Sequence, residues 1–330
     1  MKKVSIIIPL YNGAAEIGKT IQALAKQTYQ DLEIIIVDDG SKDNPGDVIA
    51  AIGDKRVIFV RQENQGPARA RNNGLSRATG EYIMFLDHDD LLAPKAIEEA
   101  VKFLEEHPDY GVAYFDFIYY MAGTPPIYYK HRLARSWSGK EVFENMLRYG
   151  PMCNPSQALM RRSAMKDAVY ENALVGSDDW DYFLQIASHG NLFGFIPKVL
   201  VYRELSRNSF TGGVAGRVKA KNSTVRLYEK WMGILPEHKI EQFGLRHALE
   251  VVLLKRAFVM IMDTQYKRAE IKEELRKLLA TAKDQKTRFR ARCILFAISV
   301  LPLSLLRALA MSFDKARMKY NFITVPAPTQ

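Results

Sequence analysis

The first third of the chain alternates short, continuous apolar runs with segments of helical character. The apolar runs are Val4–Pro9, Leu32–Val37, Arg56–Arg61 and Tyr82–Leu86, and the helical segments are Glu16–Lys26, Ala68–Ala78 and Pro94–Glu106. Strands that are apolar throughout are typical of a sheet covered on both faces. The order therefore predicts an α/β fold with a mixed, mostly parallel sheet, right-handed crossovers and flanking helices.

Polar side chains follow three of these runs at the point where each strand is expected to end. The three polar ends are Pro9-Leu10-Tyr11-Asn12, Asp38-Asp39-Gly40-Ser41 and Asp87-His88-Asp89-Asp90. Ligands of open α/β sheets bind beyond the carboxyl ends of the strands. Short polar ends are also ordinary turn chemistry, but three of them converging on one edge favour a ligand site.

The densest of these ends, Asp87-His88-Asp89-Asp90, predicts a metal site. Clustered carboxylates repel one another, and a hard divalent cation such as Mg²⁺ or Mn²⁺ relieves the repulsion by taking their oxygens as ligands. Such a cation can then hold a diphosphate. The alternative is that the acids belong to the first turn of the helix expected near Pro94. The chain lacks Gly-x-Gly-x-x-Gly after the first strand and lacks a Walker-type turn, which disfavours dinucleotide and P-loop sites.

Charge divides the chain into two parts. Residues 1–213 carry 24 Lys and Arg against 27 Asp and Glu, a net charge of −3, whereas residues 214–330 carry 23 against 10, a net charge of +13. Cys153 and Cys293 give no disulfide framework or zinc spacing, and the N-terminal apolar run is too short for a signal peptide, so a cytoplasmic location is expected.

The basic region also predicts contact with a membrane surface. Five Lys and Arg residues within 283–292 precede the apolar run Cys293–Leu306, which contains Pro302 and is too short for a confident membrane span. This pattern favours an interfacial helix on an anionic leaflet, and a helix packed on the protein is the alternative. No nucleic-acid partner is expected, because the chain shows no recognition motif and Phe289 is the only aromatic residue in the basic run.

Taken together, five segments over about residues 3–210 resemble the inverting family 2 glycosyltransferases, which have the Rossmann-like GT-A fold. In chain order these segments are Val4–Asn12, Val37–Asp43, Asn64–Asn72, Phe85–Asp90 and Gly176–Asp181. Phe85–Asp90 is similar to the Asp-x-Asp metal motif of the family, and Gly176–Asp181 is similar to its acidic base motif.

The resemblance implies a donor site for a nucleotide-diphospho-sugar, with a UDP-sugar expected. Asp39 would accept a hydrogen bond from uracil, Arg71 would approach the diphosphate, and Asp89 would bind Mn²⁺ or Mg²⁺ together with Asp87, which would also contact the ribose. The implied donor-binding residues are Pro9, Tyr11, Asn12, Asp39, Arg71, Asp87 and His88. Asp90 would support this site. A lone histidine such as His88 is more often packed or solvated than a ligand.

The resemblance also implies the residues of the acceptor side. Inverting transfer needs a carboxylate that deprotonates the acceptor hydroxyl, and Asp179 is the expected base, with Asp178 in place of the usual Glu. A helix N-cap is the alternative role for these acids, and both can hold together. The acceptor would be bound by Asn154, Gln157 and Trp180, although turn formation explains the first two equally well and core packing explains Trp180 better.

One position departs from the family pattern. Leu205 stands where many relatives carry a histidine that can reach the metal, which leaves a third protein ligand open, with Arg207, Asn208 and Ser209 as substitutes at the phosphates. The expected activity is metal-dependent sugar transfer to a glycan or lipid-linked oligosaccharide in surface-polysaccharide synthesis, at the cytoplasmic face of the plasma membrane. The alternatives are transfer to polyprenyl phosphate and a non-catalytic module that binds sugar nucleotides.

Overall fold

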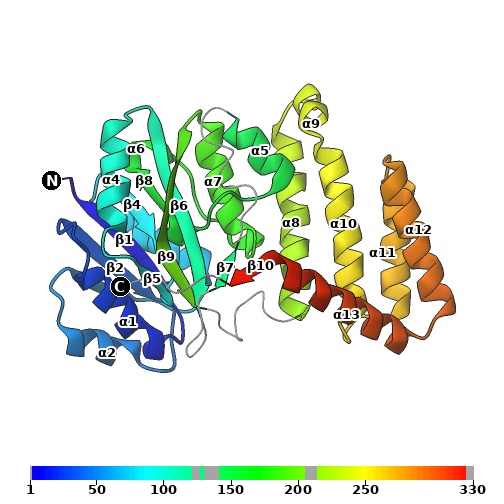
Figure 1. The fold of residues 1–330 in the computed structure, drawn as a ribbon, viewed down its shortest axis with the longest axis horizontal. Helices are drawn as coiled ribbons and strands as arrows, with labels where there is room; N and C mark the ends of the chain where they lie inside the picture. The colour runs from blue at the N-terminus through cyan, green and yellow to red at the C-terminus, as the bar shows by residue number, and fades with distance from the viewer. Residues whose placement is uncertain (1, 121–126, 130–140, 205–213, 325–330) are drawn as a thin grey trace. The chain divides into compact units, whose positions relative to one another are not determined.

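The computed structural model describes residues 2–120, 127–129, 141–204 and 214–324 (Figure 1). The chain forms two compact units, one of Met1–Leu205 with Ile323–Gln330 and the other of Ser206–Phe322.

The first unit is built on a ten-stranded sheet in the order β10-β7-β6-β8-β4-β1-β2-β3, in which β9 also pairs with β5 and β6. The longest registers, β1 with β2 and β6 with β9, are parallel, and β8 is antiparallel to both β4 and β6. This confirms the predicted mixed α/β sheet. The strands are β1 (Val4–Leu10), β2 (Leu32–Asp38), β3 (Val57–Arg61), β4 (Tyr82–Phe85), β5 (Asp90–Leu92), β6 (Tyr110–Tyr120), β7 (Ile127–Tyr129), β8 (Ala158–Arg161), β9 (Leu192–Glu204) and β10 (Phe322–Thr324).

Helices cover both faces of this sheet. Side chains of α1, α2 and α4 pack with Ile6 and Ile8 of β1, and Ala70 of α3 packs with Ile35 and Val37 on the opposite face of β2. This two-sided cover explains why the strands are apolar throughout. The helical elements of the first unit are α1 (Ala14–Ala25), α2 (Pro45–Ile52), α3 (Pro67–Arg77), α4 (Ala96–Glu106), α5 (Val142–Tyr149), η1 (Pro155–Gln157), α6 (Arg162–Met165), η2 (Asn172–Leu174) and α7 (Asp178–Ser188).

Helix α2 and strand β5 are among the elements of the first unit that were not predicted. Helix α2 begins at Pro45, after Asn44 in the left-handed region, and ends at Ile52, before Gly53, whose φ is also positive. Its eight residues are too few to show a clear helical period. Strand β5 begins at Asp90, so the last acid of the predicted metal motif is part of a strand rather than of the turn.

The second unit is helical, as predicted for the C-terminal region. Its helices are α8 (Val214–Ile234), α9 (Glu237–Phe243), α10 (Leu245–Met262), α11 (Arg268–Thr281), α12 (Gln285–Val300) and α13 (Leu303–Asn321). Pro302 lies between α12 and α13, so the apolar run Cys293–Leu306 is divided between two helices. Within the described residues, no helix combines the length and apolarity needed to cross a membrane.

Gly74 of α3 lies against β1, where a side chain has no room. A Cβ at this position would lie 2.4 Å from Cγ2 of the buried Ile7. Gly18 of α1 is the matched control, because a Cβ there would make an ordinary 3.5 Å contact with Val48.

We expect Gly74→Ala to lower the free energy of unfolding by about 1–2 kcal/mol, because the overpacking cost exceeds the gain of about 1 kcal/mol in helix propensity. Gly18→Ala should keep or slightly raise that free energy. Denaturant midpoints of both variants test this, and a Gly74→Ala variant as stable as Gly18→Ala would contradict the packing argument.

Candidate active site

The carboxyl ends of β1, β2 and β4 meet at one edge of the sheet. The parallel registers pair Leu10 with Asp38 and Ile7 with Phe85. Beyond the strands, Asp39 N–H donates to the Leu10 carbonyl at 2.8 Å, and Leu86 N–H donates to the Ile7 carbonyl at 2.9 Å. The three polar ends seen in the sequence are therefore neighbours in space.

At the end of β1, Asn12 forms hydrogen bonds that join the turn after β1 to the turn after β2. Its φ is 52°, its Oδ1 accepts from Lys42 N–H at 2.9 Å, and its own N–H donates to Ser41 Oγ at 2.9 Å. Pro9 is buried within β1, whereas Tyr11 is exposed. Of the three predicted donor residues from this strand end, Tyr11 and Asn12 are exposed, and the Asn12 side chain already binds the neighbouring turn.

Asp39 holds the loop that leads into α3. One carboxylate oxygen accepts from Gln62 Nε2 at 2.7 Å and from Gln65 N–H at 2.8 Å, and the other accepts from Gly66 N–H at 2.7 Å. The side chain is buried. Its contact with a base stays a prediction, and its structural role is to place α3.

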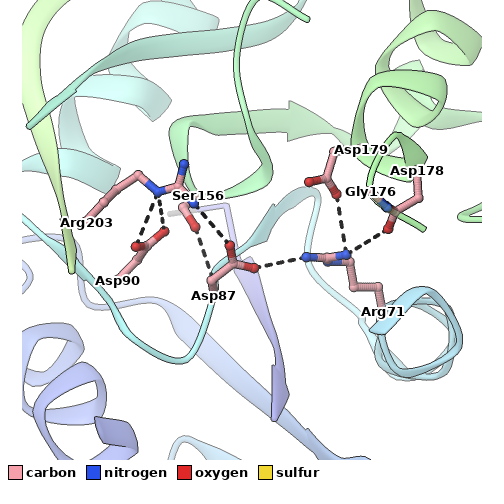
Figure 2. A network of polar contacts seen from close by, with 8 residues as sticks. All are labelled: Arg71, Asp87, Asp90, Ser156, Gly176, Asp178, Asp179 and Arg203. Atoms are coloured by element: carbon pink, nitrogen blue, oxygen red, sulfur yellow. Dashed lines mark hydrogen bonds and ion pairs between the residues drawn. The ribbon is translucent and has the colours of Figure 1, made fainter. Parts of the chain in front are cut away.

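Arg71 of α3 joins the two acidic clusters that the sequence singled out (Figure 2). Its Nη2 lies 3.0 Å from Asp87 Oδ1, and its Nη1 lies 3.2 Å from Asp178 Oδ2 and 3.4 Å from Asp179 Oδ1. The guanidinium lies 5.0 Å from the centre of the Tyr170 ring. Burial would lower the pKa of Arg71, but Asp179 and Asp87 outweigh it and raise the pKa above its ordinary value, so Arg71 stays charged.

A second arginine, the partly buried Arg203 of β9, contacts the other side of the metal motif. Strand pairing sets Arg203 opposite Asp90, and its Nε lies 3.3 Å from Asp90 Oδ2 while its Nη2 lies 3.7 Å from Asp87 Oδ2. Asp87 N–H donates to Ser156 Oγ at 3.1 Å. Burial favours neutral Asp87, but Arg71 and Arg203 outweigh it and lower its pKa. Sequence reasoning assigned no role to Arg203, although a charge inside a largely apolar strand was a signal.

Asp178 and Asp179 begin α7 and differ in access to solvent. Asp178 is buried, and its Oδ1 accepts from Gly176 N–H at 2.8 Å. The Asp179 side chain is 35% exposed. Burial raises the pKa of Asp179 to about 7, Asp178 adds to the rise, and Arg71 opposes it. Asp179 is therefore reachable and suited to accept a proton near neutral pH.

Hydrogen bonds join the segment before α7 to α3 and to the loop that precedes α3. Asn72 Nδ2 donates to the Tyr170 carbonyl at 2.8 Å, and Tyr170 N–H donates to Asn72 Oδ1 at 3.0 Å. Asn172 Nδ2 donates to the Gln65 carbonyl at 2.7 Å. The Tyr170 ring stacks on Tyr182 of α7, with ring centres 4.1 Å apart. These contacts fix α7 relative to α3.

The remaining predicted site residues have structural contacts. Gln157 accepts from Asn154 N–H at 3.2 Å and donates to the Phe115 carbonyl at 2.8 Å, and Trp180 is buried. His88 lies over Gly13, where an added Cβ would be 2.3 Å from its ring. Acceptor binding by Asn154, Gln157 and Trp180 stays a prediction. The positions considered for a third metal ligand, Leu205, Arg207, Asn208 and Ser209, lie outside the described residues.

Residues 5–168 match the family model described as Glycosyl transferase family 2, and this range contains the strand ends, Arg71 and the Asp87–Asp90 motif. This part of the chain belongs to glycosyltransferase family 2. Asp178, Asp179 and Arg203 lie beyond the matched range, and the structure joins them to it through Arg71 and Asp87.

Curated relatives of this family 2 domain are named glycosyltransferases. An uncharacterized glycosyltransferase of Rickettsia felis is 31% identical over 217 residues, 64% of this chain and 33% of that protein. Glycosyltransferase GlyG of Streptococcus pneumoniae is 42% identical over 106 residues, 31% of this chain and 35% of that protein. The chain thus spans about a third of the length of these relatives.

Solved structures share the fold. S. aureus TarS 1-349 in complex with UDP-GlcNAc has a TM-score of 0.66 at 18% identity, covering 95% of this chain and 92% of that one. The mannosyltransferase PcManGT from Pyrobaculum calidifontis, in complex with GDP-Man and Mn²⁺, has a TM-score of 0.58 at 20% identity, covering 96% of this chain and 86% of that one. At these identities the likeness shows the GT-A fold.

The acidic motif of the family 2 domain fits a divalent cation that is shared with a ligand. Among the described residues, no group of three or more His, Cys, Asp and Glu side chains is arranged to hold a metal alone. Asp89 has no ion-pair partner in the described part of the chain, and burial together with nearby Asp87 raises its pKa. Mg²⁺ is commonly held by one or two carboxylates plus substrate phosphates. Asp89 fits this role best, because both Asp87 oxygens face guanidinium groups.

Replacing Arg71 by Met would leave Asp87, Asp178 and Asp179 without their shared cation. We expect Arg71→Met to lower the free energy of unfolding by about 3 kcal/mol. This value is at the low end of the cost of breaking a buried ion pair, because two of the three carboxylates keep partial access to water. Lys102→Met is the control, since Lys102 and Glu106 form an exposed pair on α4. It should cost less than about 0.5 kcal/mol. Equal losses in the two variants, measured by denaturant unfolding, would contradict the role of Arg71.

Proposed function

We propose that the chain is a metal-dependent, inverting glycosyltransferase that moves a sugar from a nucleotide-diphospho-sugar to a glycan or lipid-linked oligosaccharide. The observation that supports this most directly is the position of Arg71 between Asp87 and Asp179. An acidic motif suited to a metal and a carboxylate suited to a base therefore adjoin one site, as transfer with inversion requires.

A uridine diphosphate sugar is the proposed donor. TarS, which shares the fold, was solved with UDP-GlcNAc and with UDP, whereas PcManGT was solved with GDP-Man. Asp39 adds an argument from this chain. A carboxylate offers about four acceptor positions, and the loop before α3 uses three of those on Asp39. The remaining position suits the single N–H donor on the pairing edge of uracil.

In the proposed reaction, an acceptor hydroxyl oxygen attacks the anomeric carbon from the face opposite the diphosphate. The bond from that carbon to the diphosphate oxygen breaks, and its electron pair leaves with the nucleoside diphosphate. Asp179 takes the proton of the attacking hydroxyl. Arg71 holds the base side and the donor side together through Asp179 and Asp87. A cation bound at Asp89 would neutralise charge on the leaving diphosphate.

Two alternatives differ in what they require of Asp179. A polyprenyl-phosphate acceptor is already an anion, so its attack needs little help from a base. A binding module would hold the donor without transfer. For the oligosaccharide acceptor we propose a place in surface-polysaccharide synthesis, at the cytoplasmic face of the plasma membrane. A panel of nucleotide sugars with Mn²⁺ or Mg²⁺, scored for nucleoside-diphosphate release, tests the proposal, and donor binding without any release favours the module.

The base role of Asp179 predicts a specific pH profile. A base must be ionised, and Asp179, whose pKa is raised to about 7, gains that charge only as the pH rises through 7. We expect kcat/KM to rise with an apparent pKa near 7. Asp179→Asn should lower kcat by about 10²–10⁴-fold and abolish the rise of kcat/KM with pH, while donor affinity is retained. A variant with full activity would favour the phosphate acceptor.

The proposed cation at Asp89 makes transfer and donor binding depend on a divalent metal. We expect chelation to abolish transfer, and added Mn²⁺ or Mg²⁺ to restore it. Asp89→Asn should raise the metal concentration needed for half-maximal donor binding at least about tenfold, because it removes a charged oxygen ligand. Glu98→Gln, an exposed acid at the start of α4, is the control. Donor binding that is unaffected by chelation, measured by calorimetry, would contradict the metal role.

A further inference from the structure

Helix α12 of the second unit carries an apolar stripe on its exposed side. Phe289 and Phe296 are each 69% exposed and Val300 is 58% exposed, and the exposed Cys293 lies between them along the chain. The spacing of these positions, i, i+4, i+7 and i+11, puts all four on one helical face. The opposite face is buried within the second unit through Thr287, Ala291 and Ile298. Solvated aromatic side chains in such a row are unusual for a soluble surface.

Cations border this stripe on both sides. At 100° per residue, Lys286 and Arg290 fall on one flank and Arg292 falls on the other. All three side chains are exposed, and none forms an ion pair within the described part of the chain. Helix α12 itself contains no Asp or Glu. An apolar stripe between two cationic flanks matches a partner that is apolar inside and anionic at its surface.

We propose that this face of α12 docks the chain on an anionic phospholipid bilayer. The two phenylalanines and Val300 enter the boundary between headgroups and acyl chains, and Lys286, Arg290 and Arg292 contact lipid phosphates. The helix lies parallel to the membrane plane, because its 16 residues, about 24 Å long, are too few to cross a bilayer. A second copy of α12 is a poorer partner, because two uncompensated cationic faces repel each other.

The proposal is independent of sugar transfer, since vesicle binding is measured without donor or acceptor. Cys293 provides a probe in the middle of the stripe, because it is exposed whereas Cys153 is buried. An environment-sensitive fluorophore attached to Cys293 reports whether this face enters lipid. Vesicles of phosphatidylcholine alone, and of phosphatidylcholine with phosphatidylglycerol, separate the electrostatic contribution from the apolar one.

We expect the full chain to sediment with the anionic vesicles, and the emission of the fluorophore to shift to the blue. Phe296→Ser should weaken vesicle binding at least tenfold, and Arg290→Gln with Arg292→Gln should weaken it in anionic vesicles alone. The matched control is Ile234→Ser, because Ile234 ends α8 and is 61% exposed without belonging to the stripe. It should bind as the unchanged chain does. Melting curves of each variant confirm that the fold is kept.

Three results would overturn the proposal. The first is no sedimentation and no spectral shift with anionic vesicles. The second is equal weakening by Ile234→Ser and Phe296→Ser, which would show general hydrophobic adsorption. The third is self-association in light scattering that Phe296→Ser abolishes while vesicle binding is unchanged, which would assign the stripe to a second copy of the chain.

Discussion

The charge balance between two arginines, Arg71 and Arg203, and five aspartates governs the site. Arg71 and Arg203 contact Asp87 from opposite sides and reach three further acids, while Asp89 has no ion-pair partner among the described residues. Burial raises the pKa values of Asp90 and Asp179 to about 7, and the charge of nearby Asp87 adds to both rises because two cations cannot neutralise five carboxylates. The site is thus short of positive charge in a way that a divalent cation can correct.

Much of the fold could be predicted from the sequence, because its central strands obey a simple rule. The runs Val4–Pro9, Leu32–Val37 and Tyr82–Leu86 are apolar throughout, and the structure covers both faces of these strands. The polar ends that follow them had to meet, since parallel strands bring their carboxyl ends to one edge. The pairing of Asp90 with Arg203 was not predictable in this way. It depends on the register of β5 with β9, which pairs two residues that are 113 positions apart in the chain.

The roles of individual polar residues were harder to predict than their location. Asp39, Asn12 and Gln157 are predicted to contact ligands, and in the structure their side chains also bind backbone groups of neighbouring segments. Asp and Asn serve turns and ligand sites through the same atoms, so their residue type does not distinguish the two uses. Arg71 was recognised because it lies within a segment, Asn64–Asn72, that resembles the family, whereas Arg203 was overlooked because it lies inside a strand.

The hydrogen bonds between the α3 region and the segment before α7 limit how these two segments can be exchanged between related proteins. Asn72 binds the Tyr170 backbone in both directions, and Asn172 binds the Gln65 carbonyl. A graft of residues 170–181 into a homologue that lacks an amide side chain at position 72 would lose two of these hydrogen bonds, and Asp178 and Asp179 would lose part of their support. The two segments would therefore have to be transferred together.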